Sequence, residues 1–559
     1  MIYNIINIIF HTAICAGIKL LDFGKGMVTN MQKKKYIAIL LSLIVIITTV
    51  GCGIEENKND NSVISGLDTK ENITLQIAIP YETNKALNTV SNAFMKKYPN
   101  VNIQLQYVED YDVNAVQLFK ENALDMILQK DIPYTEYTKT DENSEEKILD
   151  GTTTDDFFYD FGSDTEIDFS DTIPEISNNY RHTRTDEQGN EITYQYSYPL
   201  GGETRGVFVN TTLLDAYGLA VPTNYIEFID CCKVLKENGL IPIQGGADTA
   251  SYGLGIAPAA NAVVHNAEAL DKMRTAQSGI SEEFTDVLTK LYDIATNRYF
   301  DYKELEKQGY FQSTNELGQA ESFLGLRTDP NTFEVHKPEN NYGYAAFLPY
   351  ISSTETVINS LIEEYELDTK VTFICSPLNK EGESSAVYIT PYFGICANKN
   401  SKNLPWIKEF INFLFQEENN YTYAKDASII PNTADALKYT AKKYNVDIDK
   451  DITLCGQIRF SDDYNGFTPL SSGLKEVLKC SAQKYMVNLN KDAEGNIQYA
   501  CDENGRRYLY MENEETKVEE AYVGKEDPAK PGYAFCTLEY YENILEEAFG
   551  KYRENENAQ

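Results

Sequence analysis

The sequence predicts an α/β protein with two lobes, and three observations support this fold class. About 500 residues follow an apolar segment near the N-terminus, more than one hydrophobic core usually organises. Strand and helix patterns alternate in two separate regions, residues 73–108 and 206–239. Hydrophobic residues make up 42% of the chain, which is ample for a folded core.

The first of these regions predicts a strand, a helix and a second strand. Residues 73–79 alternate apolar and polar side chains with the period of two that is typical of a strand. A helix with Val90 and Phe94 on one side follows and stops at Pro99, and residues 101–107 then alternate again. Such a unit crosses over right-handedly in a parallel sheet, so we expect an α/β first lobe.

The second region predicts a short buried strand over residues 207–209 and a longer helix over residues 225–238. Thr223 or Asn224 can cap the start of this helix, and Gly239 is placed to end it.

Four further segments have simple interpretations. The dense acidic run over residues 139–171 favours a solvated loop. Residues 186–190 and 502–505 carry turn chemistry between tyrosines and predict hairpins inserted at the surface. An amphipathic helix over residues 541–552 is expected to close the fold.

The run from Met31 to Cys52 predicts an exported protein. Three lysines precede an uncharged stretch of 15 residues, too short for the roughly 20 that a spanning helix needs. TVGC at Thr49–Cys52 resembles the bacterial lipobox, which implies cleavage before Cys52 and lipidation of that cysteine. An ordinary secretory signal or an uncleaved anchor is the alternative. Because a signal peptide begins with its charged region, we expect translation to start at Met27 or Met31.

Charge and motifs exclude several classes of function. Asp and Glu number 85 against 49 Lys and Arg, so the formal net charge of −36 repels nucleic acid and anionic lipid surfaces. The chain contains no HExxH, GxSxG, GxxxxGK[ST] or CxxC motif, and enzyme interpretations lose their usual support. The cysteine spacing does not indicate a disulfide framework. We expect no catalytic residue and no cofactor.

Metal binding also lacks support. His182, His265 and His336 are scattered over unrelated segments, which argues against a histidine cluster. The start of a calcium loop at residues 447–451 lacks its glycine and its bidentate glutamate.

Three stretches together resemble the extracellular solute-binding proteins of ABC importers, in the carbohydrate-binding group that includes maltose-binding protein. They are residues 73–108 with KKYPNV, 206–239 with a YGL..P turn, and 395–432 with NKNSKN. Each stretch alone is weak, but the three stand in the family's order behind a lipobox-like segment. The resemblance implies a two-lobed, periplasmic-binding-protein-like type II fold with a hinge and ligand held between the lobes. Its crossovers should fall near residues 198–206, 388–394 and 431–469.

The resulting domain prediction divides most of the chain into segments. It comprises a start-site extension (1–30), a signal peptide (31–51), a flexible tether (52–70), lobe one (71–201 and 394–431), lobe two (202–388 and 465–555), a crossover segment (432–464) and a hairpin insertion in lobe two (481–535).

Ligand contacts are expected in the loops after strands, because ligands of open α/β sheets gather at the carboxyl ends of strands. The candidates are Tyr81, Glu82, Glu203, Arg205, Arg327, Asp329, Tyr388, Tyr392 and Phe393. Each has a structural alternative: helix capping for residues 80–83, hinge bracing for 201–205, a surface ion pair for Arg327 with Asp329, and hinge packing for the aromatic residues of 388–393.

Aromatic stacking on a sugar would have to come from tyrosine and phenylalanine. The single tryptophan, Trp406, lies in an amphipathic helix and is expected in a core, whereas the chain has 40 tyrosines.

The leading functional hypothesis is a monomeric, lipid-anchored receptor on the outer face of the bacterial cytoplasmic membrane. It would capture a sugar or oligosaccharide and deliver it to the permease subunits of an ABC transporter. A peptide or another polar solute stays open as the ligand. The rival hypothesis is a surface glycan hydrolase in which carboxylates such as Glu82 and Glu203 do the chemistry.

Overall fold

The computed structural model describes most of the chain after residue 66. The described residues are 67–81, 84–140, 147–186, 188–264, 266–275, 279–300, 315–329, 331–379, 386–433, 438, 442, 453–456, 467–480, 482–485, 492–496, 498, 501, 509 and 523–556. Cys52 with its signal segment, Glu82, His265, the calcium-loop-like residues 447–451 and the turn at 502–505 lie outside them.

A five-stranded sheet organises the first lobe, in the order β2-β1-β3-β16-β8. Its strands are β1 (Ile73–Ile79), β2 (Val101–Tyr107), β3 (Met126–Gln129), β8 (Tyr198–Pro199) and β16 (Gly394–Ala397). β1 is parallel to β2 and to β3, whereas β16 is antiparallel to β3 and β8. The predicted strand, helix, strand unit is confirmed.

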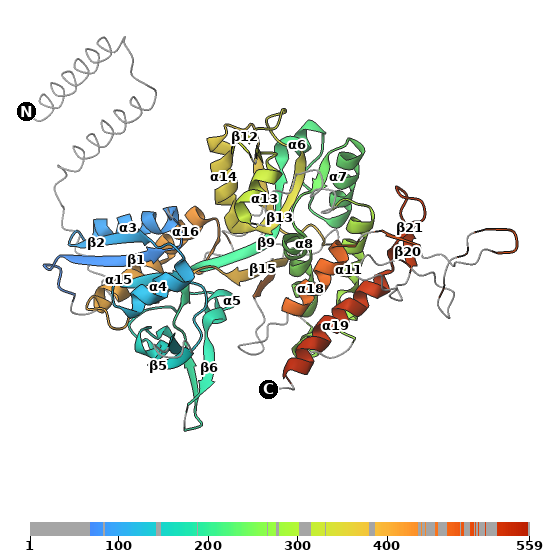
Figure 1. The fold of residues 1–559 in the computed structure, drawn as a ribbon. Helices are drawn as coiled ribbons and strands as arrows, with labels where there is room; N and C mark the ends of the chain where they lie inside the picture. Colours follow the sequence, from blue (N-terminus) through green and yellow to red (C-terminus); the bar gives the residue numbers. More distant parts are fainter. Residues whose placement is uncertain are drawn as a thin grey trace, which may run out of the picture. The chain divides into compact units, whose positions relative to one another are not determined.

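The helices of this lobe are α3 (Lys85–Lys97), α4 (Tyr111–Lys120), α15 (Leu404–Leu414) and α16 (Glu417–Ala427). α3 begins where the Asn84 side chain accepts a hydrogen bond from the Leu87 amide at 2.9 Å. It packs beside α16, although more than 300 residues separate them (Figure 1). Trp406 is buried, with its ring 5.3 Å from that of Tyr98, so the only tryptophan belongs to this core.

A seven-stranded sheet organises the second lobe. Its strands are β9 (Gly201–Asn210), β10 (Ile241–Ile243), β13 (Ala345–Ile351), β14 (Val371–Ile374), β15 (Ala386–Pro391), β17 (Ile430–Pro431) and β18 (Thr453–Gly456). β9 is central and pairs antiparallel with β13, β14, β15 and β17 along successive parts of its length. Glycine is required where this packing is closest, because a Cβ at Gly206 would lie 2.3 Å from the Ile374 carbonyl oxygen.

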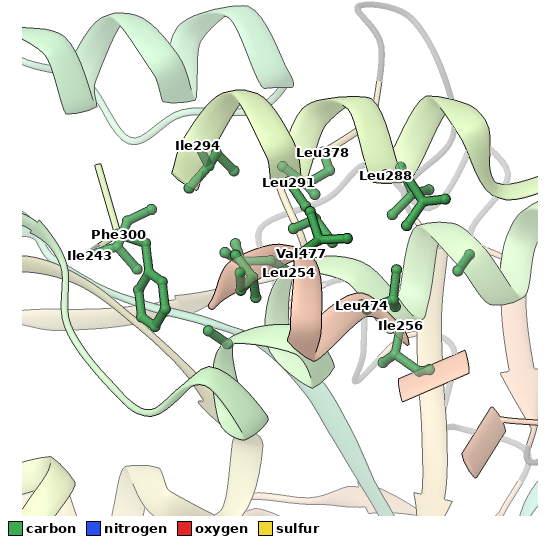
Figure 2. Close-up of a cluster of buried hydrophobic side chains, with 14 of the residues drawn as sticks. Ile243, Leu254, Ile256, Leu288, Leu291, Ile294, Phe300, Leu378, Leu474 and Val477 are labelled. Atoms are coloured by element: carbon green, nitrogen blue, oxygen red, sulfur yellow. The ribbon is translucent and has the colours of Figure 1, made fainter. Parts of the chain in front are cut away.

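The elements around this sheet are α6 (Thr211–Ala216), α7 (Tyr225–Glu237), α8 (Ala247–Ala250), the π-helical turn η4 (Ser251–Ile256), α9 (Ala257–Val264), α10 (Ala267–Arg274), α11 (Ser281–Thr296), α13 (Glu316–Phe323), the 3₁₀ turn η5 (Ser352–Thr354), α14 (Glu355–Glu364), α18 (Phe467–Leu478) and α19 (Leu538–Glu556). Figure 2 shows part of their shared core, where Leu291 of α11 meets Leu254 of η4 and Val477 of α18. Of the two predicted caps of α7, Asn224 accepts the Glu227 amide at 3.1 Å.

Several short strands and turns complete the two lobes. They are β4 (Glu136–Thr140), β5 (Lys147–Thr153), β6 (His182–Thr185), β7 (Glu191–Tyr194), β11 (Arg327–Thr328), β12 (Val335–His336), β19 (Gln483–Lys484), β20 (Val523–Glu526), β21 (Tyr533–Cys536), η1 (Thr154–Asp156), η2 (Phe161–Ser163), α5 (Pro174–Ser177) and η3 (Asn178–Tyr180). β6 and β7 confirm the hairpin predicted at residues 186–190, and the Asp186 carboxylate accepts the Asn190 amide at 2.7 Å in its turn.

The solvated loop predicted over residues 139–171 is wrong in its described part. That part contains β5, which pairs with β4, followed by the turns η1 and η2. Its acidic side chains accept backbone hydrogen bonds, as when Asp156 accepts the Thr153 amide at 2.7 Å and Asp160 the Gly162 amide at 2.8 Å. The aspartates therefore order this segment instead of only solvating it.

Two α/β lobes, as the resemblance implied, are thus built around the two sheets. The chain passes from the first sheet to the second between β8 and β9, and returns between β15 and β16. The lobe boundaries given above stay our proposal. Within the described ranges, no helix combines the length and apolar character needed to cross a membrane.

Candidate functional site

Three groups of the first lobe lie together where its strands end. Tyr81 follows β1, and its ring meets that of Phe393 edge to face, with 6.2 Å between the centroids. Lys130 follows β3, and its ammonium lies 5.5 Å from the centre of the Phe393 ring. Because β1 and β3 are parallel neighbours, their carboxyl ends bring both residues to one edge of the sheet.

The crossover between β15 and β16 holds Tyr392 and Phe393 through backbone hydrogen bonds. The Tyr392 amide donates to the Gly201 carbonyl at 2.9 Å, and the Leu200 amide donates to the Phe393 carbonyl at 3.1 Å. The two rings stand nearly perpendicular, 5.2 Å apart. We call Tyr81, Tyr392 and Phe393 the aromatic corner.

Two glutamates of the second lobe are held by consecutive hydroxyl groups. Glu203 of β9 is 4% exposed and accepts a hydrogen bond from the Ser353 hydroxyl at 2.6 Å. Glu316, the first residue of α13, accepts one from the Thr354 hydroxyl at 2.5 Å. Ser353 and Thr354 both belong to η5, so one turn orients both carboxylates, which we call the carboxylate pair.

Electrostatic effects connect the carboxylate pair to the aromatic corner. Burial raises the pKa of Glu316, and the negative charge of Glu203 raises it further. The hydrogen bond from Thr354 and the positive charge of Lys130 both lower this pKa. Burial also raises the pKa of Tyr81, and the charges of Glu316 and Glu203 raise it further. Because such effects weaken with distance, the two groups share one neighbourhood built from both lobes.

Tyr392 belongs to the same neighbourhood. Its pKa is raised well above the ordinary value by burial first, and then by Tyr423, Glu203, Tyr81 and Glu316.

Arg205 and Tyr350 add a cation and a hydroxyl on the second-lobe side. The Arg205 guanidinium lies 5.0 Å from the ring centre of Tyr252. Burial raises the pKa of Tyr350 to about 12, helped by the Glu316 charge and opposed by Arg205. Among the described residues, the buried Nε of Arg205 has no hydrogen-bond partner.

The structure brings together five of the nine residues named from the sequence: Tyr81, Glu203, Arg205, Tyr392 and Phe393. Tyr388 is 2% exposed and packs into the core of the second lobe, so we leave it out of the site. Arg327 and Asp329 lie at the β11–β12 hairpin, where the Asp329 carboxylate accepts the backbone amides of Asn331 and Thr332.

Sequence reasoning missed the other members of the site, namely Lys130, Glu316, Tyr350, Ser353 and Thr354. Lys130 and the two hydroxyl residues follow strands, so the rule that found Tyr81 could have found them. No local signal distinguishes Glu316. In the part of the chain that the structure describes, no group of three or more His, Cys, Asp or Glu residues is arranged to hold a metal ion.

Comparison with known proteins identifies the class. The family model for bacterial extracellular solute-binding proteins matches residues 79–421, and the chain belongs to this family. A comparison with curated proteins gives no match.

Solved structures of binding proteins resemble this fold at low identity. The putative binding protein MsmE of Bacillus subtilis, in an open conformation, is 16% identical with a TM-score of 0.42, covering 74% of this chain and 94% of its own. The binding protein BlMnBP1 of an ABC transporter from Bifidobacterium animalis subsp. lactis, in complex with mannobiose, is 14% identical with a TM-score of 0.46, covering 87% and 96%. The GacH receptor of Streptomyces glaucescens is 14% identical with a TM-score of 0.45, covering 73% and 93%.

Proposed function

We propose that this solute-binding protein captures a sugar or oligosaccharide between the aromatic corner and the carboxylate pair. One observation carries the proposal: segments far apart in the sequence bring three aromatic rings and two hydroxyl-bonded carboxylates into one neighbourhood. Delivery to an ABC permease, and anchoring by a lipid on Cys52 at the outer face of the bacterial cytoplasmic membrane, complete the proposed role.

The chemistry of this neighbourhood fits a sugar. A pyranose has an apolar C–H face, which packs on an aromatic ring, and a rim of hydroxyl groups that donate and accept hydrogen bonds. An ionised carboxylate has about four acceptor positions, so Glu203 can accept ligand hydroxyls while it keeps the bond from Ser353. Lys130 and Arg205 supply donors for the sugar oxygens.

Binding is expected to favour a closed arrangement of the lobes. Tyr81 and Lys130 belong to the first lobe, whereas Glu203 and Glu316 belong to the second. A ligand that contacts both sets gains its full interaction free energy only when they approach each other, which shifts the population towards closure. The closed form is the one a permease would recognise.

A thermal-shift screen of monosaccharides, disaccharides, oligosaccharides and short peptides tests the ligand class. A cognate sugar at 100 times its Kd should stabilise the protein by about 2.7 kcal/mol and raise its melting temperature. Isothermal titration should then give one site with the sugar recovered intact. Stabilisation by peptides alone would remove sugar as the ligand, and release of a cleaved glycan would favour the hydrolase.

Anchoring is tested separately in cells. Cys52→Ser should move the protein from the membrane fraction to the medium while its sugar affinity stays unchanged. Retention in the membrane fraction would contradict lipidation at this residue.

A further inference from the structure

The cysteines that flank the predicted insertion at residues 481–535 are brought together by the fold. The chain leaves the second lobe at Cys480, just after α18, and returns through β21, whose last residue is Cys536. β19 pairs antiparallel with β21, with Gln483 opposite Ala534 and Lys484 opposite Tyr533. Cys480 lies three residues before Gln483 and Cys536 lies two residues after Ala534, so the two cysteines are one residue out of register with each other. The two cysteines therefore mark the neck of the insertion.

The separation across the neck suits a disulfide. Positions that are directly opposite in an antiparallel pair have Cα atoms about 5 Å apart, and a shift of one residue gives about 6 Å. Disulfides join Cα atoms about 4.4 to 6.8 Å apart. Cys480 lies between α18 and β19, outside both elements. The alternation of side chains along β19 therefore does not fix the direction of its side chain.

Side-chain contacts place both thiols against one residue. Tyr541 of α19 lies in the core that contains Cys536 and against which Cys480 packs. Burial raises the pKa of both thiols, and the Tyr541 hydroxyl lowers the pKa of each, opposing that larger effect. Both cysteines carry free thiols in this structure, and the described chain offers no metal group that would use them.

We propose that Cys480 and Cys536 form a disulfide in the exported protein and thereby close the neck of the insertion. The family is extracellular, and disulfides persist in oxidising compartments. This inference is independent of the ligand proposed above.

The chemistry requires an external disulfide as the oxidant. The Cys480 thiolate, on the more exposed cysteine, attacks a disulfide RS–SR, forms a mixed disulfide and releases one RS⁻. The Cys536 thiolate then attacks the Cys480 sulfur and releases the second RS⁻. The protein loses two protons and two electrons, and the oxidant becomes two thiols.

The surroundings indicate a structural bond formed during folding instead of a reversible switch. Burial raises the pKa of Cys480 to about 12 and that of Cys536 to about 11. Thiols with such pKa values form little thiolate at neutral pH, so exchange in the folded protein is slow.

Peptide mapping tests the bond directly. The full exported protein is purified without reductant, alkylated under denaturing conditions and digested. We expect a linked peptide pair that contains Cys480 and Cys536 and that disappears after reduction. Cys501→Ser, which changes an exposed cysteine within the same insertion, should keep this pair. Complete alkylation of both residues, or a link from either one to Cys501, would overturn the proposal.

Thermal denaturation gives a second readout. A disulfide that closes a loop of this length should raise the melting temperature by about 4 to 8 °C, depending on whether one lobe or the whole protein unfolds. Cys480→Ser and Cys536→Ser should each lose this increment without reductant. With reductant present, they should melt close to the unmodified chain. Variants that melt like the unmodified chain without reductant would contradict the bond.

Discussion

Replacing Glu203 by glutamine is the sharpest test of the proposed sugar site. The side chain is 4% exposed on β9, and glutamine keeps an oxygen that can accept the Ser353 hydrogen bond. The change therefore removes the charge while preserving the shape. A hydrogen bond to a charged group contributes about 1.5 to 3 kcal/mol, against about 0.5 to 1.5 for a neutral one. For one or two sugar hydroxyls, the loss is about 1 to 3 kcal/mol, which corresponds to a Kd about 5- to 150-fold weaker.

Glu409 provides a matched control. It is a buried carboxylate of α15 that accepts a hydrogen bond from the Tyr98 hydroxyl at 2.6 Å, within the core of the first lobe. Glu409→Gln should lower the melting temperature but leave the Kd for sugar unchanged. Glu203→Gln should weaken the Kd for sugar without lowering the melting temperature. Isothermal titration with the ligand found in the screen measures both affinities. Unchanged affinity in Glu203→Gln, or equal weakening in the two variants, would refute the assignment.

Three further changes have defined outcomes. Tyr81→Ala should weaken sugar binding by about 5- to 30-fold, because it removes a stacking surface. Tyr217→Ala, which changes another exposed tyrosine at the end of α6, should leave titration curves unchanged. Burial raises the pKa of Glu316 above its unfolded value, so its stabilising contribution is present at acidic pH and is lost as the pH rises through the folded-state value. Glu316→Gln should therefore raise the melting temperature at pH 7 more than at pH 4, and an equal difference at both would contradict the linkage. Gly206→Ala would place a Cβ 2.3 Å from the Ile374 carbonyl oxygen, and urea denaturation should show a loss of about 1 to 3 kcal/mol; an unchanged midpoint would show that β9 adapts easily.

The elements with clear local patterns could be predicted from the sequence, and those with ambiguous patterns could not. The alternation in residues 73–79 and 101–107 leaves one possible buried face, and both strands form as expected. In α7 the spacing of the sequence puts Tyr225, Ile229 and Cys232 on one face, yet the buried residues are Phe228, Cys231, Cys232 and Leu235. Because YIEFIDCC carries apolar side chains on most of its circumference, tertiary packing decides which side faces the core.

The candidate site shows the same limit. Tyr81 could be named because it directly follows a strand, and Tyr392 and Phe393 because they occupy a crossover. Tyr388 could not be separated from them by sequence, since strand alternation assigns its face only once the neighbours of β15 are known. Glu316 becomes a site residue only through the turn η5, whose hydroxyl groups hold it beside Glu203, and no pattern within one segment encodes that meeting.

We expect the hydrogen bonding of β9 to divide the proposed site into a fixed half and a moving half. β9 pairs along its length with four other strands, so the backbone at Glu203 cannot shift without breaking that sheet. Tyr392 is held to the same strand by the hydrogen bond that its backbone amide donates to the Gly201 carbonyl. Tyr81 and Lys130, in contrast, are carried by the ends of β1 and β3 in the other sheet. We therefore expect a ligand first to occupy the fixed half, and closure to bring Tyr81 and Lys130 onto it. On this reasoning, Tyr81→Ala should speed ligand dissociation, while Glu203→Gln should weaken binding in the open and closed forms alike.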